Sequence, residues 1–274
     1  MSSALDVIVV SFNTREDSVR CLSSIFAAPP RNLRDVFVVD NASTDGSAGA
    51  VRAACPAARV IALERNVGFG AANNVALRLA TAPLVLLLNS DALVARGAID
   101  ALADRLTSTG ATAAGPRLVD GDGRPEVSFG AMLSPATELA QAIRMRLARR
   151  GGAVAKRYTR GLVSRERDVD WVSGACLLVR RDAALAAGLF DERYFLYEED
   201  VDFCAALRAG GGRILFTPAA EIVHARGRSG QAAGGDSAGH YHRSHLAFYE
   251  KHRPGWAPLL RVWQRLRSRI SPGD

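Results

Sequence analysis

Carboxylates stand near the ends of apolar segments in this sequence. Asp40 closes the run Val36–Val39, Asp91 follows the run Leu84–Leu88, and four acidic residues lie within Glu198–Asp202. A carboxylate can take a proton from an attacking hydroxyl, and it can bind a hard divalent cation. Each of these groups also suits a turn or a helix start, so its chemistry depends on what the rest of the chain brings to it.

Asparagines and glycines in the intervening loops favour a polar cleft along one edge of a sheet. They are Asn41, Asn66, Gly68 and Gly70. The glycines have the spacing G-x-G without a third glycine, so the dinucleotide-binding fingerprint is incomplete, and the sequence has no Walker motif. The cleft therefore suits a nucleotide that is recognised by carboxylates, amides and backbone groups.

Strand-like and helix-like segments alternate through the first third of the chain. Strands are predicted at 6–13, 35–40, 59–63 and 84–88, and helices at 15–27, 47–54 and 71–79. This alternation is typical of βαβ units around a parallel sheet, which binds ligands at the carboxyl ends of its strands. We therefore predict an α/β fold.

The pattern is less regular further along the chain. We expect helices at 97–107, 181–187 and 201–209, and strands at 112–116, 170–179, 213–218 and 221–224. Gly174 would lie inside a strand, where glycine marks a bulge or a close approach. Between 120 and 170 the basic, glycine-interrupted sequence predicts a solvated, mobile loop, with a contact to an acceptor or a membrane as the alternative.

The C-terminal segment predicts a helix at 240–251 and then an amphipathic helix. Arginines occupy much of the second helix. Such a helix can lie in a membrane interface or pack its apolar stripe on the domain, and the sequence leaves both interpretations open. The apolar residues that share one helical face are Leu259, Leu260, Trp263, Leu266 and Ile270.

Composition indicates a globular protein with an anionic partner. Of 274 residues, 48% are hydrophobic and 23% charged, which is enough apolar material for a full core. The net charge of +7 favours a nucleotide sugar, an anionic lipid or a nucleic acid, and the aromatic content of 7% ranks nucleic acid last. Four singly placed cysteines argue for reduced thiols and against a zinc site. With neither a signal pattern nor a membrane-spanning run, we expect a cytoplasmic protein.

Five motifs, in a fixed order, carry a specific resemblance. They are Asp40–Ser47, Asn66–Gly70, Asn89–Ala92, Trp171–Ala175 and Phe195–Asp202. From about Val7 to Ser229 the chain resembles the inverting family 2 glycosyltransferases of the GT-A fold, in the branch similar to rhamnosyltransferases of bacterial surface polysaccharides.

The resemblance implies a Rossmann-like, mostly parallel central sheet flanked by helices. It implies a catalytic domain over residues 1–230, with a nucleotide-sugar half at 1–115 and an acceptor half at 116–230. Residues 231–274 would form a C-terminal helical extension with a capacity to associate with a membrane.

The same resemblance assigns roles to individual residues. It makes Asp200 the catalytic base, with Glu199 as the neighbouring candidate for that role. The residues that would bind the acceptor are Trp171, Gly174 and Glu198. Those that would bind the nucleotide sugar are Ser11, Asn13, Asp40, Asn41, Asn66, Gly68 and Ser90.

A metal site is the last implication of the resemblance. Asp91 matches the final carboxylate of the family's Asp-x-Asp motif, and His224 matches a histidine after the last core strand, so these two would hold Mg²⁺ or Mn²⁺. Asn89 replaces the first carboxylate of that motif, which leaves the expected site one negative charge short.

Together these features predict an inverting glycosyltransferase. It would move a sugar, such as rhamnose from dTDP-rhamnose, from a nucleotide-diphosphate donor to a cell-surface glycan or polyprenyl-linked acceptor. An anionic membrane surface is a further expected partner. The alternative is a non-catalytic nucleotide- or glycan-binding module on the same scaffold.

Overall fold

The first four strands of the chain form a parallel sheet. The computed structural model describes residues 3–149, 153–225 and 237–270. The strands are β1 (Leu5–Ser11), β2 (Leu33–Asp40), β3 (Arg59–Ala62) and β4 (Leu84–Asn89), in the order β3-β2-β1-β4. Every residue of β1 is buried, because both faces of the sheet are covered. The predicted α/β architecture is confirmed.

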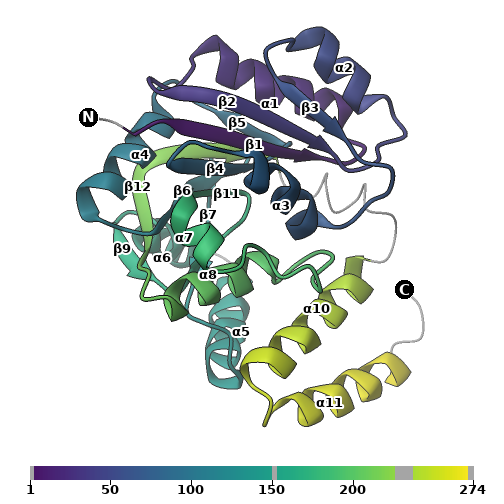
Figure 1. Ribbon diagram of the computed structural model, residues 1–274. Helices are drawn as coiled ribbons and strands as arrows, with labels where there is room; N and C mark the ends of the chain where they lie inside the picture. The colour runs from purple at the N-terminus through teal and green to yellow at the C-terminus, as the bar shows by residue number, and fades with distance from the viewer. Residues whose placement is uncertain (1–2, 150–152, 226–236, 271–274) are drawn as a thin grey trace.

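Helices cover the two faces of the sheet (Figure 1). One face packs against α1, α2 and α4, and the other against α3, α7 and α8, so the hydrophobic core is split into two layers. The bounds are α1 Arg15–Ala27, α2 Ser47–Ala54, α3 Phe69–Leu79, α4 Ala98–Thr109, α7 Arg181–Ala186 and α8 Glu199–Ala209.

The sheet continues beyond β4 with strands from the second half of the chain. Its full order is β3-β2-β1-β4-β11-β6-β12-β5. Because β11 lies antiparallel between β4 and β6, strands β6 and β12 run in the same direction as the first four. These strands are β5 (Ala92–Val94), β6 (Ala113–Val119), β11 (Cys176–Arg180) and β12 (Ile214–His224), with β7 (Pro125–Glu126) and β9 (Arg167–Val169) at the margins.

Two strand predictions need correction. The predicted strand at 170–179 is interrupted: β10 (Trp171–Val172) pairs with β8 (Phe129–Gly130) outside the main sheet, and β11 begins only at Cys176. Gly174 therefore lies in the connection and not inside a strand. Conversely, the two strands predicted at 213–218 and 221–224 are the single strand β12, whose register shifts between Thr217 and Glu221.

The segment predicted as a mobile loop contains two helices. They are α5 (Pro135–Arg149) and α6 (Ala153–Leu162). The start of α5 has a recognisable cap, because the Ser134 hydroxyl accepts a hydrogen bond from the Thr137 N–H and Pro135 occupies the first helical position. The arginines that suggested a solvated loop are good helix formers, so they are compatible with this outcome.

The C-terminal helices form a third, smaller cluster beside α8. Apolar residues of α10 (Ser237–His252) and α11 (Ala257–Ile270) pack with Leu133, Tyr194 and Val201. In Figure 1 the two helices lie together at the lower right of the molecule, and α5 reaches down beside them. Among the described residues, none of the helices is both long and apolar enough to cross a membrane.

Candidate functional site

The carboxyl ends of β1, β2 and β4 bring the predicted donor residues together. Asp40 lies opposite Ser11, and Asn89 lies opposite Val10 in the strand pairing. Asp40 is 4% exposed, and its Oδ1 is buried without a hydrogen-bond partner among the described residues. A buried acceptor without a partner is costly, so this atom is available to a donor group on a ligand.

Two of the predicted nucleotide-binding hydroxyls belong to a buried network. The Ser11 hydroxyl lies 2.8 Å from that of Ser18, and the Ser90 hydroxyl lies 2.9 Å from that of Thr14. Asn13 has a positive φ of 51° and accepts a hydrogen bond from the Thr44 N–H. These three residues therefore hold the loops of the site in place.

The amides of Asn41 and Asn66 shape the next loop. Asn41 donates to the Asn66 side-chain oxygen at 2.8 Å and accepts from the Val67 N–H at 2.9 Å. Asn66 accepts from the Gly68 N–H at 3.0 Å. Both amides use their hydrogen-bonding capacity to fix residues 66–68, which is a different use from direct contact with a nucleotide.

A narrow pocket lies over these loops. It has a volume of about 50 Å³ and is lined by Val10, Phe12, Asn41, Asn66, Gly68, Phe69, Asn89, Phe195 and Leu196. The Phe195 carbonyl accepts a hydrogen bond from the Phe69 N–H at 3.0 Å, and a Cβ added to Gly68 would lie 2.5 Å from that carbonyl oxygen. Residues 195–196 therefore close the pocket, and Gly68 makes their close approach sterically possible.

The two predicted metal ligands are in contact. His224, at the end of β12, places its Nε2 3.3 Å from Asp91 Oδ1 and 3.2 Å from Asn89 Nδ2. Glu126 lies on the other side of the ring, with its Oε2 3.8 Å from Nδ1. Sequence reasoning missed Glu126, because it lies in a two-residue strand within the segment predicted as a loop.

These residues fit a divalent cation in part. Asp91 Oδ1 is buried and has no partner with hydrogen-bond geometry, and a carboxylate beside an imidazole suits Mn²⁺ better than Mg²⁺. However, no three acidic, histidine or cysteine side chains within the described ranges are arranged as a ligand set. Burial lowers the pKa of His224, but contacts with Asp91 and Glu126 outweigh it and raise the pKa to about 9.

The three consecutive carboxylates at the start of α8 lie in different surroundings. Glu198 is buried and contacts α10, and Glu199 is buried with its Oε2 lacking a hydrogen-bond partner in the described chain. Asp200 is half-buried and accepts hydrogen bonds from the N–H groups of Gly174 and Val201, each at 2.8 Å. Of the three, Asp200 is the accessible one.

The charge of Asp200 is destabilised by its surroundings. Burial, together with the neighbouring charge of Glu198, raises the pKa of Asp200 to about 6 despite the two backbone hydrogen bonds. Burial and the charge of Asp200 raise the pKa of Glu199 well above its usual value. A carboxylate whose pKa lies near neutrality is suited to accept a proton, which favours Asp200 over Glu199 as a base.

The predicted acceptor residues have separate positions. A Cβ added to Gly174 would meet the Asp200 Cβ and the Phe69 ring, each at 3.3 Å, so Gly174 lies between Asp200 and the wall of the narrow pocket. Trp171 is half-buried, and its indole N–H donates to the Ala131 carbonyl at 2.9 Å. Its ring packs on Gly130, and that contact holds β10 beside β8.

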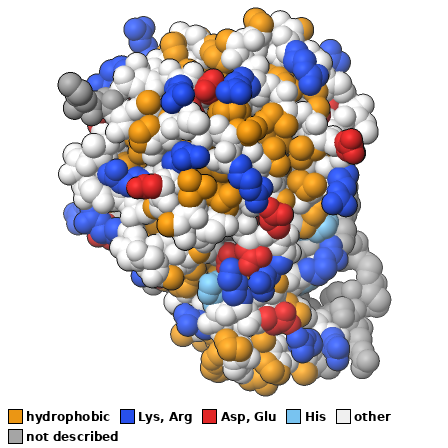
Figure 2. Space-filling view, viewed as in Figure 1, with side chains coloured by type: hydrophobic (Ala, Val, Ile, Leu, Met, Phe, Trp, Pro, Cys, Tyr) orange, Lys and Arg blue, Asp and Glu red, His pale blue; other side chains and the backbone are white. Residues whose placement is uncertain are grey.

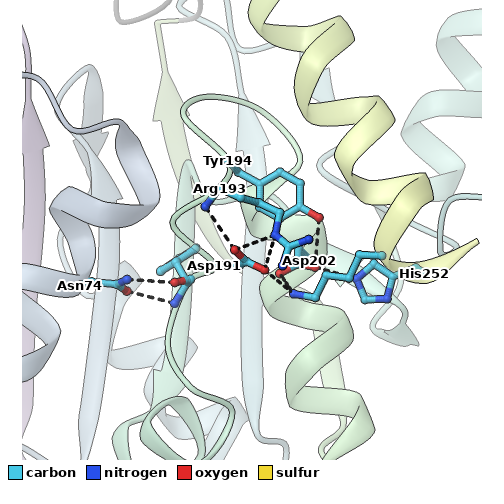
Figure 3. A network of polar contacts seen from close by, with 8 residues as sticks. Asn74, Asp191, Arg193, Tyr194, Asp202 and His252 are labelled. Atoms are coloured by element: carbon cyan, nitrogen blue, oxygen red, sulfur yellow. Dashed lines mark hydrogen bonds and ion pairs between the residues drawn. The ribbon is translucent and has the colours of Figure 1, made fainter. Parts of the chain in front are cut away.

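A network around Asp202 connects α8 to α10 (Figure 3). Asp202 is 1% exposed and contacts Lys251 Nζ at 2.9 Å and His252 Nε2 at 2.6 Å. The Tyr194 hydroxyl donates to the same carboxylate at 3.3 Å. In Figure 3 the segment with Asp191 and Tyr194 lies between Asn74 of α3 and His252 of α10.

Comparison with known proteins identifies the family of this chain. Residues 6–184 match glycosyl transferase family 2. The chain is 33% identical over 290 residues to the N-acetylglucosaminyl-diphospho-decaprenol L-rhamnosyltransferase of Mycobacterium tuberculosis, covering 98% of this chain and 93% of that protein. A shorter match, 39% identical over 56 residues, joins 20% of the chain to 21% of the rhamnosyltransferase WbbL of Escherichia coli.

Solved structures with the same fold carry nucleotides and Mn²⁺. The mannosyltransferase PcManGT from Pyrobaculum calidifontis, in complex with GDP-Man and Mn²⁺, superposes with a TM-score of 0.61 at 20% identity, covering 95% of this chain and 69% of that one. GalNAc-T7 with UDP, GalNAc and Mn²⁺ gives 0.60 at 17% identity, covering 81% of this chain and 43% of that one. The predicted GT-A fold is thereby confirmed.

Proposed function

Because the chain belongs to glycosyltransferase family 2, we propose that it transfers L-rhamnose from dTDP-rhamnose to a polyprenyl-diphosphate-linked N-acetylglucosamine, with inversion of the anomeric centre. The near full-length likeness to a rhamnosyltransferase of that specificity supports the choice of donor sugar and acceptor. The observation that carries the chemistry is Asp200, a half-buried carboxylate beside the narrow pocket with a pKa of about 6.

Inversion requires a single displacement at the anomeric carbon. The acceptor hydroxyl oxygen forms a bond to that carbon while the bond to the diphosphate oxygen breaks, and the nucleoside diphosphate leaves with the bonding electrons. Asp200 takes the hydroxyl proton as the new bond forms. The backbone N–H groups of Gly174 and Val201 orient the carboxylate for this role.

The donor would lie along residues from the first half of the chain. Asp40 has the free acceptor atom suited to the base or ribose, and the loop fixed by Asn41 and Asn66 would line the diphosphate side. Since these groups come from residues 1–115 and the base comes from residues 116–230, the contacts support a donor half and an acceptor half.

Asp91 and His224 would hold a divalent cation, for which we propose Mn²⁺. Its chemical contribution would be to offset the negative charge that grows on the leaving diphosphate. The support for this role is the unpartnered Oδ1 of Asp91 beside the imidazole.

We also propose that the C-terminal helix docks the enzyme on the cytoplasmic face of an anionic membrane. Leu260 of α11 packs inward, whereas Trp256, Leu259, Val262 and Trp263 are 50–62% exposed. Figure 2 shows apolar side chains gathered along the bottom edge of the molecule, where α11 lies, next to basic ones. An apolar stripe beside arginines is the arrangement that binds an anionic lipid interface, where a polyprenyl-linked acceptor resides.

The variant Asp200→Asn tests the proposed chemistry. It keeps the shape of the side chain but removes the proton acceptor, so we expect transfer to fall at least about a hundredfold, the lower range for general-base catalysis. Affinity for dTDP-rhamnose, measured by calorimetry, should remain within a few-fold of that of the parent protein. Near-normal transfer by this variant would refute Asp200 as the base, and a parent protein that binds the donor without transfer would favour the binding module.

A further inference from the structure

Helix α10 contacts residues 195–198, which lead into an acidic cluster. The cluster consists of Glu198, Glu199, Asp200 and Asp202. The His240 ring stacks on Phe195 with ring centroids 4.6 Å apart, and the Ser244 hydroxyl donates to the Leu196 carbonyl at 2.8 Å. The Tyr197 hydroxyl lies 2.6 Å from that of Ser237. The conformation of residues 195–198 therefore depends on a helix that begins some forty residues later in the chain.

The segment held in this way is strained. Tyr197 and Glu198 have φ values of 71° and 65°, a left-handed conformation that is unfavourable for a residue with a side chain. Consecutive residues in this conformation persist only when their surroundings hold them. Strain of this kind, directly before a catalytic carboxylate, points to a site that needs a fixed geometry.

His245 stands at the centre of the contact with α10. It is 5% exposed and lies between two carboxylates: its Nδ1 is 3.2 Å from Glu198 Oε1, and its Nε2 is 3.3 Å from Glu138 Oε2. The Tyr249 hydroxyl donates to Glu138 at 2.5 Å, which fixes the far carboxylate. The imidazole thus links α5, α10 and the residue two positions before Asp200.

The charged and titratable groups around His245 favour an imidazolium. Glu138 comes from α5, Glu198 precedes α8, and Tyr241 and Tyr249 flank the ring on α10 with centroid distances of 5.4 and 5.1 Å. Burial lowers the pKa of His245, but hydrogen bonds and charges from the two glutamates outweigh it and raise the pKa to about 9. At neutral pH both ring nitrogens of His245 are therefore protonated, and the ring is a cation.

Glu198 is also a neighbour of the base. Its negative charge is one of the causes that raise the pKa of Asp200, and Glu199 on the other side is buried. The His245 imidazolium lies 3.2 Å from the Glu198 carboxylate. Because two opposite charges this close act at a distance nearly as a neutral pair, the imidazolium reduces the electric field that Glu198 exerts on Asp200. An uncharged partner would leave that field unopposed.

We propose that His245 is a positioning residue for the base: its imidazolium, anchored by Glu138, holds Glu198 on α10 and offsets the Glu198 charge beside Asp200. This inference rests on the proposed function, since it requires Asp200 to act as the base. Helix α10 thereby influences the proton affinity of Asp200 as well as the shape of the site.

The pH profile of His245→Gln tests the proposal. Glutamine retains hydrogen-bonding groups but no charge, so the pKa of Asp200 should rise and the acid limb of the kcat profile should move upward by roughly one pH unit. Transfer at pH 6 should then fall several-fold more than transfer at pH 8. By pH 8 Asp200 is ionised in both proteins, so the pH-dependent part of the loss should disappear there.

Three variants and one melting measurement make the outcome specific. In the His245→Gln background the charge of Glu198 is no longer offset. Glu198→Gln removes that charge, so it should return the acid limb to the parent position or below it. Glu138→Gln removes one of the two carboxylates beside the His245 ring. It should shift the acid limb in the same direction as His245→Gln, but by less. His242→Gln changes a half-buried histidine of the same helix that forms no ion pair within the described chain, and it should leave the limb in place. Thermal melts establish that each variant is folded.

The results separate this inference from the proposed function. A loss of transfer by the same factor at every pH, or an unshifted limb in folded His245→Gln, would overturn the positioning role while Asp200→Asn is inactive. Full transfer by Asp200→Asn would instead refute the base assignment on which the inference rests.

Discussion

At the scale of single residues, the cation that we propose for Asp91 and His224 would change the protonation of this pair. Contacts with Asp91 and Glu126 outweigh burial and raise the pKa of His224 to about 9. A metal must bind a neutral imidazole, so metal binding at this site releases a proton. Affinity for the cation should therefore increase with pH across the neutral range.

Mn²⁺ binding by Asp91→Ala checks the metal assignment. Removing the carboxylate should weaken Mn²⁺ affinity, measured by calorimetry or electron paramagnetic resonance, at least about tenfold, and EDTA should lower transfer by the parent protein. Asp122→Ala is the matched control, because it removes an exposed carboxylate paired with Arg124. Unchanged Mn²⁺ affinity in Asp91→Ala together with EDTA-resistant transfer would exclude a cation at this pair.

The sequence predicts candidate site residues that end strands, but it gives no local signal for the contacts that His245 makes. Asp40, Asp91 and His224 stand where apolar runs stop, which is a local signal. The contact of His245 with Glu198 joins residues 47 positions apart, so no local pattern indicates it. A partial signal existed, since four of the five histidines lie at 240–252 and an acidic cluster stands at 198–202.

At the scale of elements, residues 195–196 and the loop before α3 form a close backbone contact. Gly68 has a φ of +89°, and the Phe195 carbonyl fills the space where a side chain would begin. Residues from the two halves of the chain therefore meet at the narrow pocket, three positions before Glu198.

Gly68→Ala tests whether this contact matters for transfer. The methyl group would force the two backbones apart, so we expect transfer to fall at least about tenfold. We also expect a stability loss of about 1–3 kcal/mol, because the Gly68 backbone (φ 89°, ψ 167°) is one that essentially only glycine adopts. Gly188→Ala provides the control: its φ is +85°, yet nothing lies within 4 Å of the added Cβ. Equal transfer by the two variants, once corrected for stability in thermal melts, would contradict the importance of the contact.

The elements also show what periodicity can predict. The helices at Arg15–Ala27 and Ser47–Ala54 have the bounds expected from their apolar spacing. By contrast, α5 was missed because its arginines obscure the stripe, although Ser134 and Pro135 form a start signal that could have been found. The break at Gly174 was missed because its backbone N–H bonds to Asp200, a partner 26 residues away.

At the scale of the whole molecule, exposed apolar side chains lie on α5, which carries Glu138, and on α11, which packs against α10. Leu139 and Ile143 of α5 are 62% and 52% exposed, and Leu259 and Val262 of α11 are 62% and 55% exposed. His245 of α10 contacts both Glu138 of α5 and Glu198. Because α11 packs on α10, the helix that we propose docks on a membrane lies next to the helix that contacts the residues before Asp200.

Vesicle co-sedimentation of Leu259→Glu/Val262→Glu tests the membrane role. Burial of two such side chains contributes about 3 kcal/mol or more, so the double variant should bind phosphatidylglycerol vesicles at least about tenfold more weakly. Leu185→Glu, on α7, introduces a charge at a leucine that is 41% exposed and should leave binding unchanged. Equal sedimentation of all three proteins would count against docking through α11.

The contacts of α10 with residues 195–198 have a consequence for folding during synthesis on the ribosome. A ribosome releases the sheet, the donor loops and the acidic cluster before it releases residues 237–252. Until that helix emerges, Tyr197 and Glu198 lack the partners that maintain their left-handed backbone. The nascent chain can therefore form the two core layers around its sheet before the backbone beside Asp200 is held in place. If Asp200 is the base that we propose, competence for transfer would require the same C-terminal segment that we propose docks on the membrane.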